Sequence, residues 1–390
     1  MPASRSPILI VAIAARALAQ SARKGGFCVV ALDRFGDCDT RAAAGTVRAI
    51  PCGDAGFNAR ALLRAADEVC PRDRGHGLVY GSGLEGRTDL LGMLSEGRRR
   101  YGNSPRTVAD MKDPRHFFAL LDKLGIPHPE TRLEPPRRLD GWLAKQQGAS
   151  GGGHVRAAGL IRGNARGRRY YYQRREPGRC VSVLFLADGR RCRVFGVSET
   201  WTTSWDARAP YRFAGAVSDV DLDPAVVFQL GEAAQALTAA AGLVGFNGLD
   251  ALVREKEFSV LEINPRPGAT FELYDAKCGE SFFALHLRAC DGDLAEPSYV
   301  SGAVRAHAVV YAPRPVTISG ALTWPDWCSD LSEPGTAIAA GAPLCMVHAA
   351  GPTAARARRL VLEREALVSQ SFTLAPSVAA AQPVLVAAPA

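Results

Sequence analysis

The chain has 390 residues, a formal net charge of +8, 47% hydrophobic residues and 22% charged residues. This composition is that of a globular protein with several subdomains, and it excludes a chain that is disordered, collagen-like or coiled-coil as a whole. Only six of the 47 basic residues are lysines. The arginines are scattered except at 98–100 and 166–175, so nucleic acid is not expected as a partner.

The cysteines and the N-terminal segment bear on the compartment. None of the ten cysteines forms a C-x-x-C pair, which argues against a zinc ribbon or a disulfide scaffold. The apolar run after Arg5 imitates a signal peptide, but Arg16 interrupts it. No apolar stretch reaches the roughly 18 residues of a membrane span. We therefore expect a cytoplasmic protein without a membrane partner.

Residues 1–105 alternate between apolar strands and helices, a pattern typical of an open parallel α/β sheet. No G-x-G-x-x-G motif follows the first strand, so a Rossmann-type dinucleotide site is not supported. Strands are expected at 7–13, 27–32 and 77–80, and helices at 14–24 and 59–69.

The rest of the chain mixes helices with strands that include an antiparallel pair. A strand that begins at Trp142 runs into the glycine-rich loop 148–153, and the pair is predicted at 248–253 and 259–263. After residue 300, short strands and many Pro and Gly residues precede a late helix at 354–368. The other expected elements are helices at 113–125 and 224–242 and strands at 170–173, 181–186 and 195–203.

Three oxygen-bearing side chains are predicted to converge on the antiparallel pair. Glu262 and Asn264 alternate along one strand and therefore share a face, and Asp250 can reach them from the neighbouring strand. Two carboxylates and an amide oxygen suit Mg²⁺ rather than zinc. Taken alone, the same residues could also be a hydrogen-bonded sheet edge.

The glycine-rich loop favours a phosphate site near these oxygens. Its small residues expose backbone N–H groups that can approach phosphate closely, and Lys145 on the preceding strand adds a point charge. A flexible linker is the alternative for the loop. The Gly-Lys-Ser/Thr ending of a P-loop is absent, so a Walker-type ATPase is disfavoured.

The order of these features resembles the ATP-grasp superfamily, whose fold occurs in D-alanine–D-alanine ligase, biotin carboxylase and glutathione synthetase. The resemblance covers about residues 75–280, and its strongest part is Asp250 together with Glu262-x-Asn264-x-Arg266. Within the superfamily, the chain looks like the ATP-dependent carboligases of archaea and methylotrophic bacteria, which are also similar at 81–85, 102–104 and 124–130.

The resemblance implies sites for ATP and for Mg²⁺, with Mn²⁺ as a substitute. Asp250, Glu262 and Asn264 would hold the metal, and Arg266 with Asn264 would stabilise the transferred phosphoryl group. The residues implied to contact ATP are Lys112, Lys145, the flap residues Gly151, Gly152 and Gly153, and the hinge residues Gln173, Arg174, Arg175 and Glu176. The candidates for the substrate are Ser82, Glu85 and Thr270.

The chain departs from the family pattern at three positions. Arg174 stands where the family usually has Glu, Cys180 stands near a position that often carries the carboxylate for the ribose, and Gly248 replaces an arginine. How the ribose is held is therefore left open, although Glu176 could substitute.

The implied fold is α/β (α+β), with an N-terminal pre-ATP-grasp domain and two subdomains that sandwich the nucleotide. The expected boundaries are 1–105 for the N-terminal domain, 106–170 for the small subdomain with the flap, 171–298 for the large subdomain with the hinge and metal strand, and 299–390 for a small β-rich C-terminal domain with a late helix.

The implied reaction is the ATP- and Mg²⁺-dependent joining of a small-molecule carboxylate to an amine through an acyl phosphate. A finer expectation is the addition of an amino acid such as glutamate to a methanopterin- or methanofuran-type one-carbon cofactor, and the assembly could be a homodimer. The alternatives are carboxyphosphate formation, a small-molecule kinase, or a non-catalytic nucleotide or RNA binder. Because no protein nucleophile is needed, the cysteines and histidines are interpreted as core or surface residues, apart from His154 beside the flap.

Overall fold

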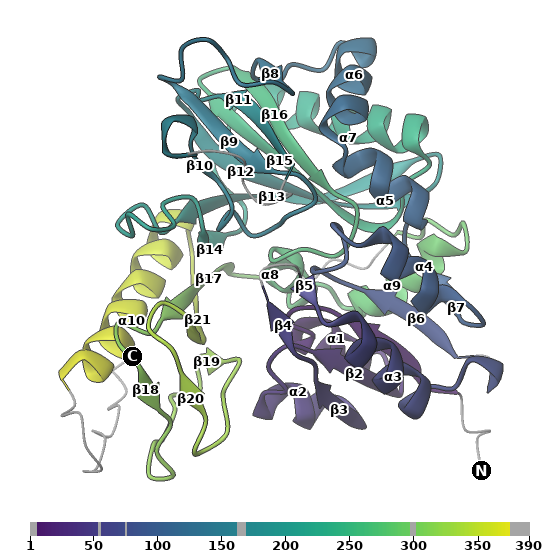
Figure 1. Cartoon of the computed structure of the whole chain (residues 1–390), viewed down its shortest axis with the longest axis vertical. Helices are drawn as coiled ribbons and strands as arrows, with labels where there is room; N and C mark the ends of the chain where they lie inside the picture. Colours follow the sequence, from purple (N-terminus) through teal and green to yellow (C-terminus); the bar gives the residue numbers. More distant parts are fainter. Residues whose placement is uncertain (1–5, 54–55, 75, 162–168, 297–301, 375–390) are drawn as a thin grey trace.

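The computed structural model describes residues 6–53, 56–74, 76–161, 169–296 and 302–374. These residues form several sheets and about ten helices, and Figure 1 shows the N-terminal, middle and C-terminal parts as three neighbouring groups. The predicted mixed α/β fold class is confirmed. Among the described residues, no helix combines the length and apolar composition needed to cross a bilayer.

The N-terminal part is a five-stranded parallel sheet in the order β3-β2-β1-β6-β7. Its central strand is completely buried at Leu9, Ile10 and Val11, as expected for a sheet covered on both faces. Its elements are β1 (Ile8–Val11), α1 (Arg16–Lys24), β2 (Val29–Asp33), α2 (Cys38–Ala43), β3 (Thr46–Ala49), the pair β4 (Cys52–Gly53) and β5 (Gly56–Phe57), α3 (Ala59–Val69), the 3-10 turn η1 (Arg72–Arg74), β6 (Gly77–Tyr80), α4 (Thr88–Ser95) and β7 (Arg99–Tyr101).

Two capped helices lead out of this sheet. Ser104 accepts from the Thr107 amide at 2.9 Å and starts α5 (Pro105–Lys112), and Asp113 caps α6 (Pro114–Leu124). Gly125, with φ +66°, ends α6 in the left-handed conformation. Helix α6 matches its prediction, whereas α5 was not predicted.

The middle part contains two antiparallel sheets. The smaller sheet has the order β10-β9-β11-β8, and the larger has the order β16-β15-β12-β13-β14-β17-β21-β19. The small sheet consists of β8 (Thr131–Arg132), β9 (Trp142–Gln146), β10 (Arg156–Ala157), followed by the 3-10 turn η2 (Ala158–Leu160), and β11 (Tyr170–Arg174). The large sheet begins with β12 (Arg179–Asp188), β13 (Cys192–Thr202), β14 (Phe213–Val217), β15 (Val244–Arg254) and β16 (Glu257–Asn264), accompanied by α7 (Pro224–Ala241), α8 (Phe271–Asp275) and α9 (Phe282–Cys290).

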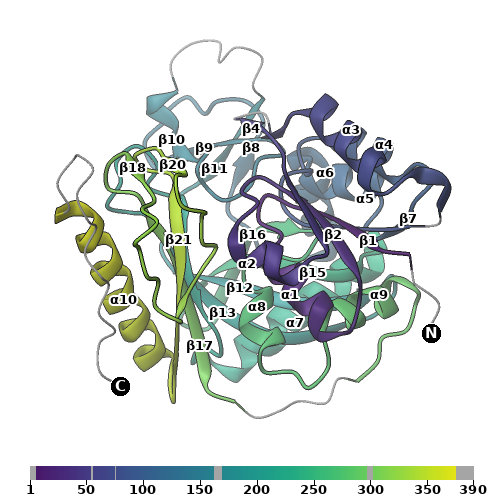
Figure 2. The same ribbon diagram turned by 90° about the horizontal axis from the view of Figure 1, so that it is seen from below.

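The C-terminal strands continue the large sheet, because β17 pairs with β14. The two views agree that α10 covers β17 and β21 on the side away from α1 and α2 (Figures 1 and 2). The predicted boundary at residue 299 is thus crossed by a shared sheet. The C-terminal elements are β17 (Val304–Tyr311), β18 (Val316–Thr317), β19 (Cys328–Ser329), β20 (Ala337–Ile338), β21 (Pro343–Gly351) and α10 (Ala354–Leu374).

An aromatic cluster fixes α8 directly after the strand that carries Glu262 and Asn264. Phe271 packs edge-on against Phe246 at a ring separation of 5.3 Å and against Phe282 at 5.4 Å. Both contacts lie within the range of favourable aromatic pairs. The segment between β16 and α8 is therefore anchored at its α8 end.

Candidate active site

The three predicted oxygen ligands lie together on β15 and β16. Asp250 stands directly opposite Glu262 in the antiparallel register, and Gly248 stands opposite Asn264. Asn264 Nδ2 donates to Asp250 Oδ2 at 2.8 Å. Strand pairing thus brings two carboxylates and one amide to the same place, as the alternation predicted.

Lys112, the last residue of α5, reaches this oxygen cluster. Its Nζ atom lies 3.2 Å from Glu262 Oε2 and 3.0 Å from Asn264 Oδ1, and only 7% of its side chain is exposed. A cation therefore stands between two of the three candidate ligand atoms. An all-oxygen donor set that already surrounds a positive charge fits Mg²⁺.

The two carboxyl groups of the cluster have opposite pKa shifts. Burial and the charge of Glu262 raise the pKa of Asp250 to about 6. Burial also opposes the ionisation of Glu262, but the charges of Lys112 and Lys145 outweigh it and lower its pKa to about 2. At neutral pH both groups are ionised, which is the state that binds a divalent cation.

Arg266 is held beside the cluster by Glu85. Its Nε atom donates to Glu85 Oε1 at 2.7 Å, and its Nη2 atom lies 3.4 Å from Asn264 Oδ1. Both side chains of the ion pair are buried. Glu85, predicted as a substrate contact, thus has Arg266 as its partner and links the loop after β6 to the oxygen cluster.

Lys145 on β9 is the second predicted phosphate ligand. Its Nζ atom donates to Gln173 Oε1 at 2.5 Å, and Gln173 Nε2 donates to Thr131 Oγ1 at 3.3 Å. Burial lowers the pKa of Lys145. The lysine and the first hinge residue are therefore parts of one hydrogen-bonded chain across β9, β11 and β8.

The other hinge residues make contacts of a different kind. The Arg174 guanidinium lies 5.7 Å from the Trp142 ring centre and donates to Asp140 O at 3.3 Å. The Arg175 amide donates to Gly141 O at 2.8 Å. Arg174 and Arg175 are exposed, and Glu176 is half-buried. The Arg174 side chain thus packs on the outside of the small sheet.

The glycine-rich loop lies against two neighbouring segments. A Cβ atom on Gly152, which has φ +71°, would stand 1.9 Å from Tyr211 O. A Cβ atom on Gly148, with φ +69°, would stand 2.7 Å from Gly86 Cα. Glycine is therefore required where the loop meets the chain before β14 and the loop after β6.

A pocket lies between this loop and the oxygen cluster, and charged, polar and apolar side chains line it. His154 lines it, and its buried Nδ1 atom has no hydrogen-bond partner among the described residues. Burial lowers the pKa of His154 to about 4, so the ring is neutral at pH 7. The lining residues are Met111, Lys112, Pro114, Phe117, Phe118, Gln146, Gly148, Ala149, His154, Tyr171, Leu261 and Glu262.

Residues 111–270 match a family model described as an ATP-grasp domain. This part of the chain is an ATP-grasp domain. The matched region contains Lys112, Lys145, the flap, the hinge and the oxygen cluster. No curated protein matches the sequence with statistical significance.

Solved structures share the ATP-grasp fold over nearly the whole chain. Pyruvate carboxylase of Rhizobium etli is 15% identical with a TM-score of 0.70, over 94% of this chain and 39% of that one. The biotin carboxylase domain of Hydrogenobacter thermophilus 2-oxoglutarate carboxylase, solved with MgADP and bicarbonate, is 13% identical with a TM-score of 0.72, over 95% and 94%. N5-carboxyaminoimidazole ribonucleotide synthetase of Thermotoga maritima is 16% identical with a TM-score of 0.63, over 93% and 98%.

The remaining predicted residues lie around the ATP-grasp domain. Ser82 accepts from the Ile13 amide through its backbone oxygen at 2.9 Å, and Thr270 is buried at the start of α8. Gly151 O accepts from the Phe213 amide at 3.0 Å, whereas Gly153 has open space at its Cβ position. Residues 162–168, part of the predicted basic cluster, lie outside the described residues.

The apolar walls of the pocket were not predicted from the sequence. Met111, Tyr171 and Leu261 belong to three different elements that meet only in the fold. Met111 directly precedes Lys112, and Leu261 directly precedes Glu262. This adjacency to predicted site residues was the signal in the sequence that could have indicated them.

Proposed function

We propose that this protein is an ATP- and Mg²⁺-dependent ligase that joins a carboxylate to an amine. The observation that carries the proposal is the contact of Lys112 and Arg266 with the Glu262 and Asn264 cluster inside an ATP-grasp domain. Two cations beside converging oxygen ligands suit the stabilisation of a phosphoryl group during transfer.

Each residue of the site has a proposed role. Asp250, Glu262 and Asn264 would hold Mg²⁺, which supplies charge neutralisation at the phosphates. The Lys112 ammonium group contacts two of these ligands, Glu262 and Asn264. When Mg²⁺ binds to them instead, Lys112 would contact a phosphate oxygen. Arg266, fixed by Glu85, would stabilise the transferred phosphoryl group.

The nucleotide is proposed to bind in the pocket beneath the flap. The aromatic and aliphatic walls, such as Tyr171 and Leu261, suit a purine ring, while Lys145 would contact a phosphate. The Nδ1 atom of neutral His154, which has no hydrogen-bond partner in the described part of the chain, offers a hydrogen-bond acceptor or donor to the nucleotide. Gly151, Gly152 and Gly153 would cover the phosphates and exclude water.

The proposed reaction has two steps. A carboxylate oxygen of the substrate attacks the γ-phosphorus of ATP and ADP leaves, which gives an acyl phosphate. The amine nitrogen then attacks the acyl carbon, inorganic phosphate leaves, and the nitrogen loses a proton to form the amide. The protein contributes positioning and charge stabilisation rather than a covalent intermediate.

Carboxyphosphate formation is the second candidate. It is favoured by the solved structures with this fold, which include a biotin carboxylase domain with bound bicarbonate and a carboxyaminoimidazole ribonucleotide synthetase. The same residues would then phosphorylate bicarbonate. The addition of an amino acid such as glutamate to a one-carbon cofactor rests on the sequence resemblance alone. A homodimer is proposed because the Hydrogenobacter domain is described as a dimer.

A panel of ADP-release assays separates these functions. The enzyme is incubated with ATP and Mg²⁺ together with a carboxylic acid library plus an amine library, with bicarbonate plus the amines, and with neither. We expect ADP and an amide of matching mass only when acid and amine are both present. ADP formation that requires bicarbonate and no organic acid would favour the second candidate, and ADP formation with neither would contradict both.

A further inference from the structure

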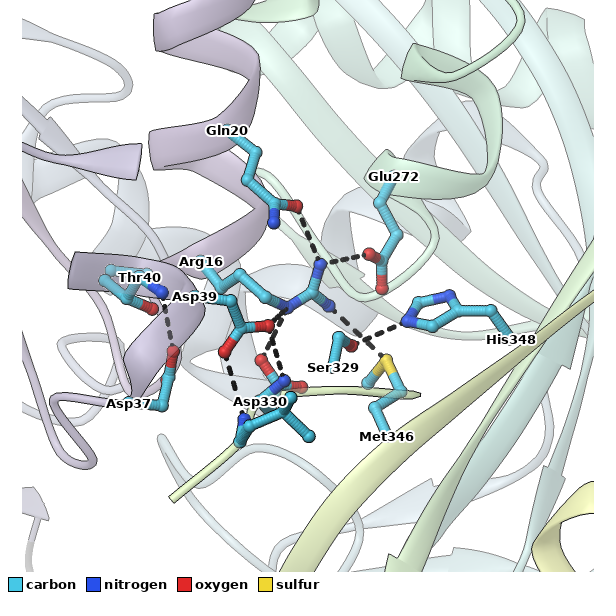
Figure 3. Close-up of polar contacts among 12 residues, drawn as sticks. Arg16, Gln20, Asp37, Asp39, Thr40, Glu272, Ser329, Asp330, Met346 and His348 are labelled. Atoms are coloured by element: carbon cyan, nitrogen blue, oxygen red, sulfur yellow. Dashed lines mark hydrogen bonds and ion pairs between the residues drawn. The ribbon is translucent and has the colours of Figure 1, made fainter. Parts of the chain in front are cut away.

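A second polar group lies outside the ATP-grasp site, where α1, α8 and the C-terminal strands meet (Figure 3). Buried Arg16, at the start of α1, contacts three carboxylates. Its Nη1 atom is 2.8 Å from Glu272 Oε2, and its Nε atom is 2.6 Å from Asp330 Oδ1 and 3.7 Å from Asp39 Oδ2. One cation therefore faces three anions in a largely buried place, where unbalanced charge is costly.

Two histidines stand beside this excess of negative charge. One ligand atom each from Glu272, His307 and His348 can be chosen so that all three lie within 4.8 Å of one another. His307 Nδ1 is 3.1 Å from Glu272 Oε1, yet neither ring nitrogen of His307 has a hydrogen-bond partner among the described residues. Because His307 is completely buried, its Nδ1 atom has the Glu272 carboxylate beside it, whereas its Nε2 atom lacks, among the described residues, the partner that buried polar atoms normally have.

The spacing and the ligand types fit one class of ion. A tetrahedral zinc site with bonds of about 2.1 Å places neighbouring ligand atoms about 3.4 Å apart, close to the 3.1 Å between His307 and Glu272. Two imidazoles and a carboxylate suit zinc, whereas Mg²⁺ prefers oxygen alone. Ser329 Oγ lies 2.6 Å from His348 Nε2 and orients the ring.

We propose that Glu272, His307 and His348 bind a divalent transition-metal ion of the Zn²⁺ class, with water as a further ligand. The proposal goes beyond the ligase function and does not depend on it. The Glu272 side chain is 17% exposed, which gives water and the ion access to the site. One divalent ion together with Arg16 would balance the three carboxylates.

The ion would join separate parts of the chain. Glu272 belongs to α8, His307 to β17 and His348 to β21. Through Arg16 the site also reaches helix α1 of the N-terminal part. We therefore expect the metal to stabilise the junction between these parts, and its binding is measurable without ATP.

Metal analysis of the full-length protein tests the proposal. The protein is purified without chelator and without a histidine tag, and its zinc content is measured by inductively coupled plasma mass spectrometry. The stripped protein is then titrated with Co²⁺, whose visible absorption reports tetrahedral coordination, and with Zn²⁺ during thermal unfolding. We expect about one zinc per chain, a cobalt spectrum and a Tm raised by zinc.

Variants assign the ion to its ligands. His307→Ala, His348→Ala and Glu272→Gln should weaken zinc binding at least about tenfold and abolish the zinc-dependent rise in Tm. Exposed His116→Ala and Glu262→Gln, which alters the magnesium cluster, should bind zinc as the wild type does. If an alanine variant does not fold, the zinc content of the wild-type protein and the zinc affinity of Glu272→Gln decide whether the site binds zinc. Absence of zinc and of a cobalt spectrum in the wild type, or unchanged binding in all three ligand variants, would overturn the proposal.

Discussion

Arg266 and Glu85 form a buried ion pair that joins the ATP-grasp domain to the N-terminal sheet. Their Nε and Oε1 atoms are 2.7 Å apart, and Glu85 Oε2 also accepts from the Gly83 amide at 2.6 Å. Burial opposes the ionisation of Glu85, but the charges of Arg266 and Lys112 outweigh it and hold its pKa below the usual value. The guanidinium is therefore fixed by a loop outside the ATP-grasp domain.

Substitution of Glu85 should loosen Arg266 and slow the chemical step. We expect Glu85→Gln, which keeps an acceptor, to lower kcat by about 10–100-fold with little change in the KM for ATP. Glu85→Ala should also reduce the free energy of unfolding by about 3–5 kcal/mol, because it leaves a buried unpaired charge. Exposed Glu68→Gln is the control for both measurements. Wild-type kcat in Glu85→Gln would contradict a positioning role.

Glu262→Ala and Asn264→Ala should abolish turnover while the fold persists. Each change removes a proposed metal ligand, so we expect kcat to fall at least about 100-fold, with Tm within a few degrees of the wild type. ADP release and circular dichroism provide the two readouts. A loss of folding that parallels the loss of activity would instead mean that these residues are structural.

Lys112→Arg and Lys145→Arg should both weaken ATP binding. Each lysine is a compact charge in a confined place, with Glu262 and Asn264 around Lys112 and Gln173 beside Lys145, and the wider guanidinium does not fit the same geometry. We expect about a tenfold higher Kd for ATP by calorimetry in each variant. The exposed Lys123→Arg change should leave the Kd unchanged. Wild-type affinity in both active-site variants would remove the lysines from the nucleotide site.

Gly152→Ala and Gly153→Ala form a matched pair in the flap. The added methyl group at Gly152 would collide with Tyr211 O, and φ there is +71°, whereas the Cβ position of Gly153 meets nothing within 4 Å. We expect Gly152→Ala to displace the flap and lower kcat at least tenfold. A tenfold decrease corresponds to a loss of about 1.4 kcal/mol of transition-state stabilisation. Gly153→Ala should stay within about twofold. Steady-state ATP turnover compares the two variants. Equal changes in kcat would argue that the position of the flap against Tyr211 does not matter for catalysis.

His286 should make a destabilising contribution to the stability of the protein in mild acid. Its Nδ1 atom accepts from the Phe246 amide at 2.9 Å and its Nε2 atom faces Tyr101 O at 3.2 Å, and burial lowers its pKa to about 4. The unfolded chain, with a histidine pKa of about 6.5, binds the proton first. His286 should therefore contribute a drop in stability of about 1.4 kcal/mol per pH unit between these two values.

Urea unfolding at several pH values isolates this contribution. His286→Asn, which keeps an acceptor for the Phe246 amide, should show a shallower dependence on pH between 6 and 4 than the wild type. The exposed His116→Asn change should retain the wild-type slope. Identical slopes in all three proteins would assign the acid sensitivity to other groups.

The part of the site that strand geometry controls could be predicted from the sequence. Alternation places Glu262 and Asn264 on one face, and the short turn of the hairpin brings Asp250 opposite Glu262. The strand with Lys145 and the glycine loop after it could also be predicted, because the local sequence pattern is enough to indicate both.

The remaining contacts depend on the tertiary fold. Glu85 and Arg266 are 181 positions apart, and nothing local in either segment indicates the other. Arg16, His307 and His348 lie on three separate elements, so no local pattern joins them. The histidines were therefore interpreted only as core or surface residues. Helix α5, which carries Lys112, was missed although Ser104-Pro105 is a helix start signal.

The transfer of oxygen from the acid substrate to phosphate tests the ligase mechanism most directly. Once the panel has identified an acid and an amine, the reaction is run with the carboxylate labelled with ¹⁸O on both oxygens, and the released phosphate is analysed by mass spectrometry. Acyl-phosphate chemistry at the Glu262 and Asn264 cluster predicts one ¹⁸O in each phosphate and one amide for each ADP. Phosphate without ¹⁸O, with ADP still released, would contradict it.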